Sequence, residues 1–275
     1  MTYKTIVINL NVHTNNLKGL VQQAISIGER YGGHLVGVHI QPLDPFPMYA
    51  ESRLPSIVLQ MYKDLQTEIS EKARRSFERQ VAGSGCSYEF IELRGNTDEK
   101  INKMARYADL VITSQIVNGR PKSDLKGIES GIILGAPCPV MIIPASYSAD
   151  FFGRRVMIAW DGSKEVSRAV KSAICILKTS SFVELVSIVK DSKTDDLNHE
   201  QIFQFLNRHG VEARSEFLEQ SNLSVADRII ERIPKCGADL LIMGAYGHSR
   251  LKEMVLGGTT LDMLKRPPVP ILLEH

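Results

Sequence analysis

Apolar residues along this chain follow two alternating patterns. Short apolar runs such as residues 6–8 and 156–158 are bounded by polar residues, as in strands buried within a sheet. Each run precedes a segment, residues 17–25 or 166–177, in which apolar residues recur three or four positions apart, as on one face of a helix. This alternation of strand and helix predicts an α/β fold with a parallel sheet and helices on both faces.

The whole pattern occurs twice. At an offset of 150 residues, residues 6–8 fall on residues 156–158 and Asn11 falls on Asp161. Four further strand pairs lie at residues 34–40 and 182–189, 88–93 and 212–218, 108–112 and 238–242, and 138–142 and 269–273. We therefore predict two tandem five-stranded parallel-sheet domains, residues 1–147 and 153–275, joined by a short polar link. The strand order expected in each is 3-2-1-4-5.

The first unit is longer than the second, mainly through residues 41–82. Four prolines, at positions 42, 45, 47 and 55, predict an irregular loop over residues 41–54. A long helix is expected from Ser56, with apolar residues recurring every four positions at Ile57, Met61, Leu65, Ile69, Ala73 and Phe77. Two interpretations remain open: a core-facing stripe with a solvated charged face, or a lid or partner-binding arm.

Composition narrows the class of protein. The 275 residues are 43% apolar and 23% charged with a formal net charge of +2, which indicates a globular protein and gives no electrostatic case for nucleic acid binding. No apolar run approaches the roughly 18 residues of a membrane span, and the N-terminus lacks the apolar region of a signal peptide. A cytoplasmic location is expected. The cysteines, at positions 86, 138, 175 and 236, lack the paired spacing of a zinc or disulfide site.

The glycine-rich stretch at residues 243–260 has the form G-x2-G-x9-G. Gly244 and Gly247 follow the apolar run at residues 238–243, and Gly257 precedes an expected helix that begins with Gly258, Thr259 and Thr260. Free N–H groups and the helix dipole at such a start attract an anion, which predicts a cradle for nucleotide phosphates. Glycines near turns also occur for the turn alone, so that alternative stays open.

Asp161 strengthens the nucleotide interpretation by its position. It ends the first strand of the second unit, and Gly244 follows the fourth strand. In the order 3-2-1-4-5 these two strands are neighbours at the switch point of the sheet, where ligands bind beyond the carboxyl ends. Asp161 is expected to contact the nucleotide, or else to form only a strand-to-helix turn with Ser163 as the N-cap.

With these features placed, the chain resembles the universal stress protein family over nearly its whole length, as a tandem pair. The resemblance implies an adenine-nucleotide-binding α/β fold, in which many members bind ATP and others do not. It implies contacts to adenine and ribose by the strand-one residues Ala159 and Asp161 and the strand-two residue Ile188. Contacts to ribose and phosphates are implied for Met243, Gly244, Gly247, Gly257, Gly258, Thr259 and Thr260.

Two positions depart from the family pattern. Gly258 stands where the family usually has serine or threonine, so one hydroxyl contact to phosphate is missing; Thr259 or Thr260 could supply it. Trp160 is bulkier than the residue usual at its position, next to the adenine side of the pocket. His248 and Arg250 are expected either to reach phosphate oxygens or to lie in a solvated loop.

The first unit lacks most of the motif. Asn11 replaces the aspartate, Ser114 and Val117 replace the first two glycines, and Gly127 alone falls at the position of Gly257. We expect no ATP there and a degenerate partner domain. The polar cluster Asn9, Asn11, Asn15 and Asn16 is expected to serve turns and caps, or to hold another small ligand.

No set of residues for fast chemistry emerges from the motifs. The expected ligand is ATP, with or without Mg²⁺, and the protein is expected not to be an enzyme, or at most to hydrolyse ATP slowly. Three hypotheses remain: an ATP-binding regulatory protein of the stress response, a nucleotide-free interaction module, and a nucleotidyl or phosphoryl transferase.

Assembly is a further expectation. Members of the family commonly pair through their last strands, so residues 136–143 and 268–273 are expected to lie antiparallel within the chain. A homodimer of two chains is also considered. Pairing of this kind covers two sheet edges that would otherwise be exposed.

Overall fold

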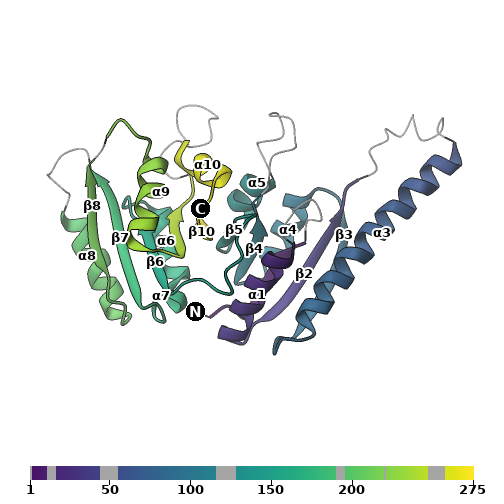
Figure 1. Ribbon diagram of the computed structural model, residues 1–275, viewed down its shortest axis with the longest axis horizontal. Coiled ribbons are helices and arrows are strands. Elements are labelled where there is room, and N and C mark those ends of the chain that lie inside the picture. The colour runs from purple at the N-terminus through teal and green to yellow at the C-terminus, as the bar shows by residue number, and fades with distance from the viewer. Residues whose placement is uncertain are drawn as a thin grey trace.

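Ten strands form one continuous sheet in the computed structural model of the chain (Figure 1), which describes residues 2–10, 17–43, 55–115, 128–189, 196–219, 221–246 and 258–275. The strands of the first half are β1 (Thr5–Asn9), β2 (His34–Gln41), β3 (Tyr88–Arg94), β4 (Leu110–Ser114) and β5 (Val140–Ile143). Those of the second half are β6 (Arg155–Ala159), β7 (Phe182–Val189), β8 (Arg214–Glu219), β9 (Leu240–Gly244) and β10 (Ile271–Glu274).

The strand order across the sheet is β3-β2-β1-β4-β5-β10-β9-β6-β7-β8. Within each half this is the predicted order 3-2-1-4-5, and all neighbours in a half are parallel. The last strands of the two halves, β5 and β10, hydrogen-bond to each other in antiparallel orientation, so the two five-stranded halves form one ten-stranded sheet.

The junction between the halves is antiparallel and fully buried. Ile271 lies opposite Ile142, and Leu273 lies opposite Val140. All four side chains are at most 1% exposed. Each of these strands would form an open edge if its half stood alone, so the pairing covers both edges with apolar side chains on each side.

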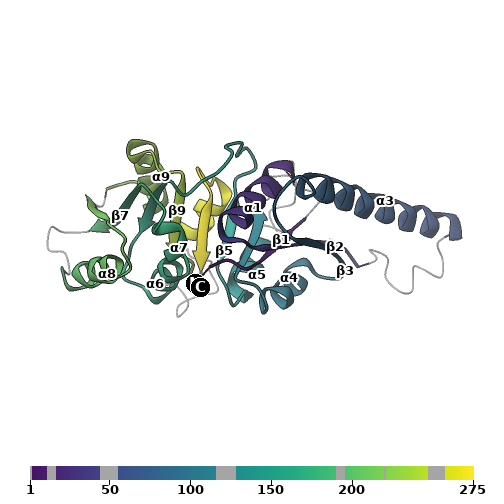
Figure 2. The same cartoon turned by 90° about the horizontal axis from the view of Figure 1, so that it is seen from below.

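Helices cover both faces of the sheet, as Figure 2 shows for α1 and α3 on one side of the first half and α4 and α5 on the other. One face, here called the α6 face, is covered by α1 (Leu17–Tyr31), α3 (Ser56–Val81), α6 (Lys164–Ser172), α7 (Ile174–Leu177) and α8 (Asp196–Arg208). The opposite face, called the α9 face, is covered by α4 (Thr97–Ala105), α5 (Ile128–Gly135), α9 (Val225–Cys236) and α10 (Gly258–Lys265).

Each face has one apolar core that runs through both halves. Ile8 and Ile158 belong to the core of the α6 face, and their neighbours Val7 and Met157 belong to that of the α9 face. This assignment follows from the alternation of side chains along a strand. The same alternation decides which face of the sheet each candidate site residue occupies.

The aspartate in the best-matching segment of the repeat, Ala-Asp-Leu, has the same structural role in both halves. The Asp109 carboxylate accepts hydrogen bonds from the backbone N–H groups of Lys4 (2.8 Å) and Thr5 (2.9 Å) at the start of β1. The Asp239 carboxylate accepts three, from Gly153, Arg154 and Arg155 at 2.9–3.1 Å, at the start of β6. Each aspartate directly precedes the fourth strand of its half, and its hydrogen bonds hold the start of that strand beside the start of the first strand.

The predicted core-facing stripe on the long helix α3 is only partly correct, because only part of it faces the core. Ala73 and Phe77 are buried against the sheet, but Ile57 and Met61 are each 64% exposed and Leu65 is 52% exposed. A helix turns about 100° per residue, so residues four apart drift by about 40° per step and the stripe winds around the helix. Its second half therefore faces the core, while its first half faces solvent.

The amino-terminal end of α3 projects beyond the end of the sheet (Figure 1). Of the loop expected over residues 41–54, Gln41 belongs to β2, and residues 44–54 lie outside the described residues. Although α3 has 26 residues, no helix in the described ranges combines the length and apolar character that crossing a membrane requires.

Candidate functional site

Three of the predicted contact residues lie on one face at the carboxyl ends of adjacent strands. Ala159 at the end of β6 is the register partner of Met243 on β9. Ile188 lies on the neighbouring strand β7, two residues beyond the partner of Ala159. All three border the core of the α9 face, and Ala159 and Ile188 remain partly exposed. They form an apolar wall at the predicted switch point.

Trp160 lies on the opposite face. Its side chain packs against the core of the α6 face, and its backbone is held by Val186, whose carbonyl accepts the Trp160 N–H at 2.8 Å. Ser187 Oγ donates to the Trp160 carbonyl at 2.7 Å. The bulk of this indole therefore does not narrow the space beside Ala159, and strand alternation would have indicated this from the sequence.

Asp161 takes part in the turn that leads from β6 into α6. Its Oδ1 accepts the Ser163 N–H at 3.0 Å, and Ser163 Oγ accepts the Val166 N–H at 3.3 Å as the N-cap of α6. Gly162 supplies the left-handed backbone of the turn, with φ of 74°. The capping turn considered from the sequence is thus present. The Asp161 side chain is nevertheless exposed, so a ligand beyond the strand ends can still reach it.

Gly244 has a packing reason to be glycine. A Cβ built on it would lie 2.6 Å from the Val166 nitrogen and 2.9 Å from Glu165 Cβ, in the first turn of α6. Such distances are far inside van der Waals contact, so only glycine lets α6 approach β9 this closely. The glycine is required on the α6 face, whereas Met243 beside it points to the α9 face.

The start of α10 has different surroundings. A Cβ on Gly258 would meet no atom of the described residues within 4 Å, and Thr259 is partly exposed. Thr260 is only 5% exposed, and its Oγ1 accepts the Tyr246 N–H at 3.3 Å. The first turn of α10 therefore offers open backbone at Gly258 and a hydroxyl that is already engaged at Thr260.

Four predicted site residues lie outside the described residues: Gly247, His248, Arg250 and Gly257. Tyr246 carries no role in the sequence prediction, although it lies two residues after the end of β9 and has a left-handed backbone with φ of 60°. Its place between Gly244 and Gly247 is the signal that could have indicated such a turn.

The corresponding place in the first half is occupied by a polar pair. Asn9 and Thr113 stand where the second half has Ala159 and Met243, and Asn9 Nδ2 donates to Thr113 Oγ1 at 3.2 Å. Both side chains are 3% exposed. Ser114, at the position of Gly244, is also buried. Asn9 thus has a buried contact rather than a turn duty; the remaining positions, Asn11, Asn15, Asn16, Val117 and Gly127, lie outside the described residues.

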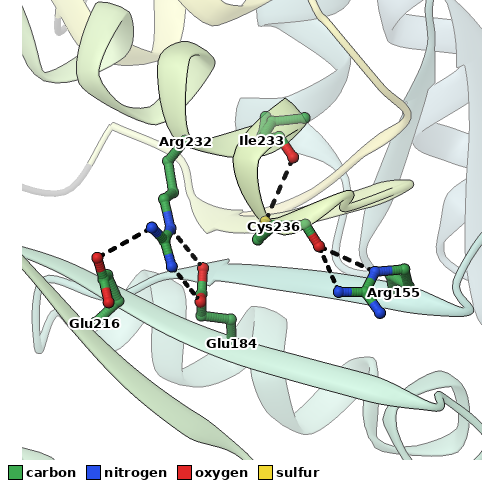
Figure 3. A network of polar contacts seen from close by, with 6 residues as sticks. All are labelled: Arg155, Glu184, Glu216, Arg232, Ile233 and Cys236. Carbon is green, nitrogen blue, oxygen red and sulfur yellow. Dashed lines mark hydrogen bonds and ion pairs between the residues drawn. The ribbon is translucent and has the colours of Figure 1, made fainter.

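A charged network lies between α9 and the outer strands of the second half (Figure 3). Arg232 donates to both carboxylate oxygens of Glu184, at 2.9 and 2.6 Å, and pairs with Glu216 at 3.1 Å. Nearby, Arg155 donates to the Cys236 carbonyl at the end of α9. Glu184 is 4% exposed, so its charge needs this partner. The network fixes α9 on the sheet.

Other reactive side chains give no sign of a catalytic centre in the described ranges. All four cysteines are free thiols there, and burial raises the pKa of Cys138 to about 12. Burial likewise raises the pKa of Cys86, Cys175 and Cys236, which keeps these thiols protonated. No group of three metal-binding side chains occurs within those ranges.

Comparison with known proteins gives one family in both halves. The model of the "Universal stress protein family" matches residues 2–144 and 153–274. The universal stress protein Slr1230 of Synechocystis sp. is 29% identical over 145 residues, which are 51% of this chain and 48% of that protein, so the match spans about half the length of this relative.

Solved structures show the same architecture. The universal stress protein from Archaeoglobus fulgidus DSM 4304 aligns over 98% of this chain and 95% of its own with a TM-score of 0.77. At 18% identity this likeness shows the fold alone. A universal stress protein solved in complex with cAMP covers 53% of this chain and 100% of its own at 15% identity, with a TM-score of 0.41.

Proposed function

Since this chain belongs to the universal stress protein family, with one match to the family model in each half, we propose that its second half binds an adenine nucleotide, with ATP as the principal ligand. The observation that carries this proposal is the convergence of Ala159, Ile188 and Met243 on one face at adjoining strand ends. Ligands of open α/β sheets bind at such a switch point.

Each group of residues suits a different part of the nucleotide because of its chemistry. The apolar wall of Ala159, Ile188 and Met243 suits adenine, and the exposed Asp161 carboxylate is an acceptor for ribose hydroxyls. The first turn of α10, with open backbone at Gly258 and the side chain of Thr259, suits phosphates through its free N–H groups and helix dipole. The family motif adds Gly244, Gly247, Gly257 and Thr260 to this site, and His248 and Arg250, which follow Gly247 in the sequence, are further candidates for contact with phosphate oxygens.

In the proposal the first half binds no nucleotide and serves as a structural partner. The buried pair of Asn9 and Thr113 occupies the place of the apolar wall, so adenine would displace a satisfied hydrogen bond there. The chain would then act as a regulatory protein with one ATP site, in the stress response that gives the family its name. A cytoplasmic location belongs to the same proposal, as does ATP bound with or without Mg²⁺.

Two measurements test the nucleotide site. The purified protein is denatured and the released small molecules are separated by chromatography, and we expect adenine nucleotide. Calorimetric titration with ATP, ADP, AMP, adenosine and cAMP then gives stoichiometry and preference, with Trp160 fluorescence as a second signal because it is the only tryptophan and adjoins Asp161. We expect one ATP per chain.

The matched variant is Gly247→Val, which gives the second half the valine that the first half has at Val117. Its side chain would occupy the approach of phosphate to backbone, so ATP affinity should fall at least about tenfold while adenosine binding changes less. Far-ultraviolet circular dichroism checks that the variant is folded. Absence of ATP binding in the wild-type protein would refute the proposal.

One observation favours a second candidate, a nucleotide-free interaction module. The projecting part of α3 exposes Ile57, Met61 and Leu65, which a solitary protein rarely leaves in water as a cluster. Wild-type protein that binds no nucleotide but self-associates, with Met61→Glu abolishing the association, would favour this candidate. An ATP turnover assay with Mg²⁺ addresses the third hypothesis, for which a rate typical of ordinary enzymes would be needed.

A further inference from the structure

The turn that follows β9 holds a residue in an unusual backbone conformation. Tyr246 has φ of 60°, in the left-handed region that side chains other than glycine and asparagine rarely adopt. Its side chain is 6% exposed and belongs to the core of the α9 face. A residue of this kind persists only where its surroundings hold it firmly.

At least three contacts among the described residues hold this turn. The Ala245 N–H donates to the Glu274 carbonyl at 3.0 Å, and His275 Nδ1 lies 2.9 Å from the Ala245 carbonyl, so both backbone groups of Ala245 are tied to the end of β10. The third contact comes from α10, where Thr260 Oγ1 accepts the Tyr246 N–H at 3.3 Å. This last bond alone among the three reaches the phosphate side of the candidate site.

The Thr260–Tyr246 bond joins the two ends of the glycine-rich segment. Tyr246 lies at its start, directly after Gly244 and Ala245, and Thr260 is the third residue of α10 at its end. Thr260 is 5% exposed, so its side chain points into the protein rather than toward a ligand beyond the strand ends. Thr259 next to it is partly exposed.

We propose that Thr260 is a positioning residue of the nucleotide site: its hydroxyl fastens the strained Tyr246 turn to the first turn of α10 and sets the spacing of the phosphate-binding backbone before ligand arrives. This inference rests on the proposed function. The family resemblance allows Thr260 to contact phosphate directly. In this inference Thr260 has a positioning role instead, and Gly258 and Thr259 make the phosphate contact. Preformed spacing lowers the ordering cost of binding.

Three variants separate the two duties. Thr260→Val keeps the shape of the side chain and removes the hydroxyl, Thr260→Ser keeps the hydroxyl, and Thr259→Val removes the neighbouring hydroxyl as a matched control. The first readout needs no ligand: hydrogen exchange of the Tyr246 amide in the nucleotide-free protein. The second is calorimetric affinity for ATP and for adenosine.

In Thr260→Val we expect the Tyr246 amide to exchange about fivefold to tenfold faster, as the loss of one buried hydrogen bond implies, and ATP affinity to fall by a similar factor. Thr260→Ser should restore both. Thr259→Val should leave the exchange rate unchanged. If Thr260→Val fails to fold, the comparison of Thr260→Ser with Thr260→Ala replaces it with the same expectation.

Unchanged Tyr246 exchange in Thr260→Val, with ATP affinity lost and adenosine affinity kept, would overturn the inference and make Thr260 a direct phosphate ligand. Faster exchange without any change in ATP affinity would also overturn it, because the bond would then be structural only. Wild-type protein that binds no ATP would refute the proposed function and the positioning role together, whereas the exchange rates would still report whether the bond holds the turn.

Discussion

Gly244 and Gly258 belong to the same motif and meet opposite surroundings. Around Gly244 the first turn of α6 leaves no room for a methyl group, whereas no atom of the residues that the structure describes lies within 4 Å of a Cβ placed on Gly258. The first glycine is therefore required by packing, whether or not a ligand binds. At the second glycine, the described residues leave room for the hydroxyl that the family usually carries there.

Gly258→Ser should preserve stability within about 0.5 kcal/mol and strengthen ATP binding by about tenfold through one added hydrogen bond to phosphate. Gly244→Ala should instead destabilise the fold by about 1–3 kcal/mol through overpacking against α6. Urea unfolding and calorimetry of both variants test the contrast. Equal stability of Gly244→Ala and wild type would show that α6 does not need this glycine.

Glu274, at the end of β10, gives the fold a pH dependence. Burial raises the pKa of its carboxyl, while a hydrogen bond from Ser172 Oγ at 2.6 Å partly offsets this shift. The unfolded chain ionises near the ordinary value of about 4.3, below the folded pKa. The contribution of this group to stability is thus fully present below the unfolded pKa and is lost as pH rises through the folded pKa.

Glu274→Gln removes the ionisation and keeps an acceptor for Ser172. Relative to this variant, the wild-type unfolding free energy should fall as pH rises above the ordinary carboxyl pKa of about 4.3 and level off once the folded carboxyl is ionised, as urea titrations at a series of pH values would measure. Glu68→Gln is the control of opposite sign, because the hydrogen bond from Lys72 lowers the pKa of Glu68. The same trend in both variants would contradict the assignment.

At the scale of the element, α3 shows what spacing can and cannot predict. The existence of a helix from Ser56 was predictable, since apolar residues recur every four positions and the four prolines end before it. The buried face was not, because a repeat of four drifts around the helix axis. The buried positions Ser70, Ala73, Phe77 and Val81 keep a mixed spacing of three and four that stays on one side.

Phe77→Ala and Met61→Ala form a matched test on this helix. Phe77 is fully buried and packs edge-on against Tyr88, so its truncation should cost about 3–5 kcal/mol of stability. Met61 is 64% exposed, and its truncation should change stability by no more than about 0.5 kcal/mol. Chemical denaturation measures both, and a large loss in Met61→Ala would mean that this face is covered in solution.

At the scale of the whole molecule, the repeat allowed the strand order of each half to be predicted from local patterns alone. The charged network of Arg232, Glu184 and Glu216 could not be predicted, because its members come from three elements with no shared spacing. For the candidate site, Ala159, Ile188 and Met243 were named from the family resemblance, and the structure places them on one face at neighbouring strand ends. The need for glycine at position 244 and the hydrogen bond of the Thr260 hydroxyl could not be predicted from the sequence, because both depend on contacts with neighbouring helices.

Ile142→Lys tests whether the β5–β10 junction holds the halves together in solution. Ile142 and its partner Ile271 are completely buried, so a buried unpaired ammonium should destabilise the protein by several kcal/mol or separate the halves. Small-angle scattering would show an increased radius of gyration. Ile57→Lys, the same substitution at a position 64% exposed, is the control. Unchanged compactness and stability of Ile142→Lys would count against the pairing.

The place of β10 in the sheet also bears on synthesis. It is the last strand in chain order among those described, yet it lies sixth across the sheet, between β5 and β9. A ribosome adding roughly 5–20 residues per second finishes β5 roughly ten seconds before β10. During that interval the first half can fold with β5 lacking its outer neighbour, and two nascent chains on one messenger could pair through it. This strand order therefore exposes the chain to misassembly while it is being synthesised.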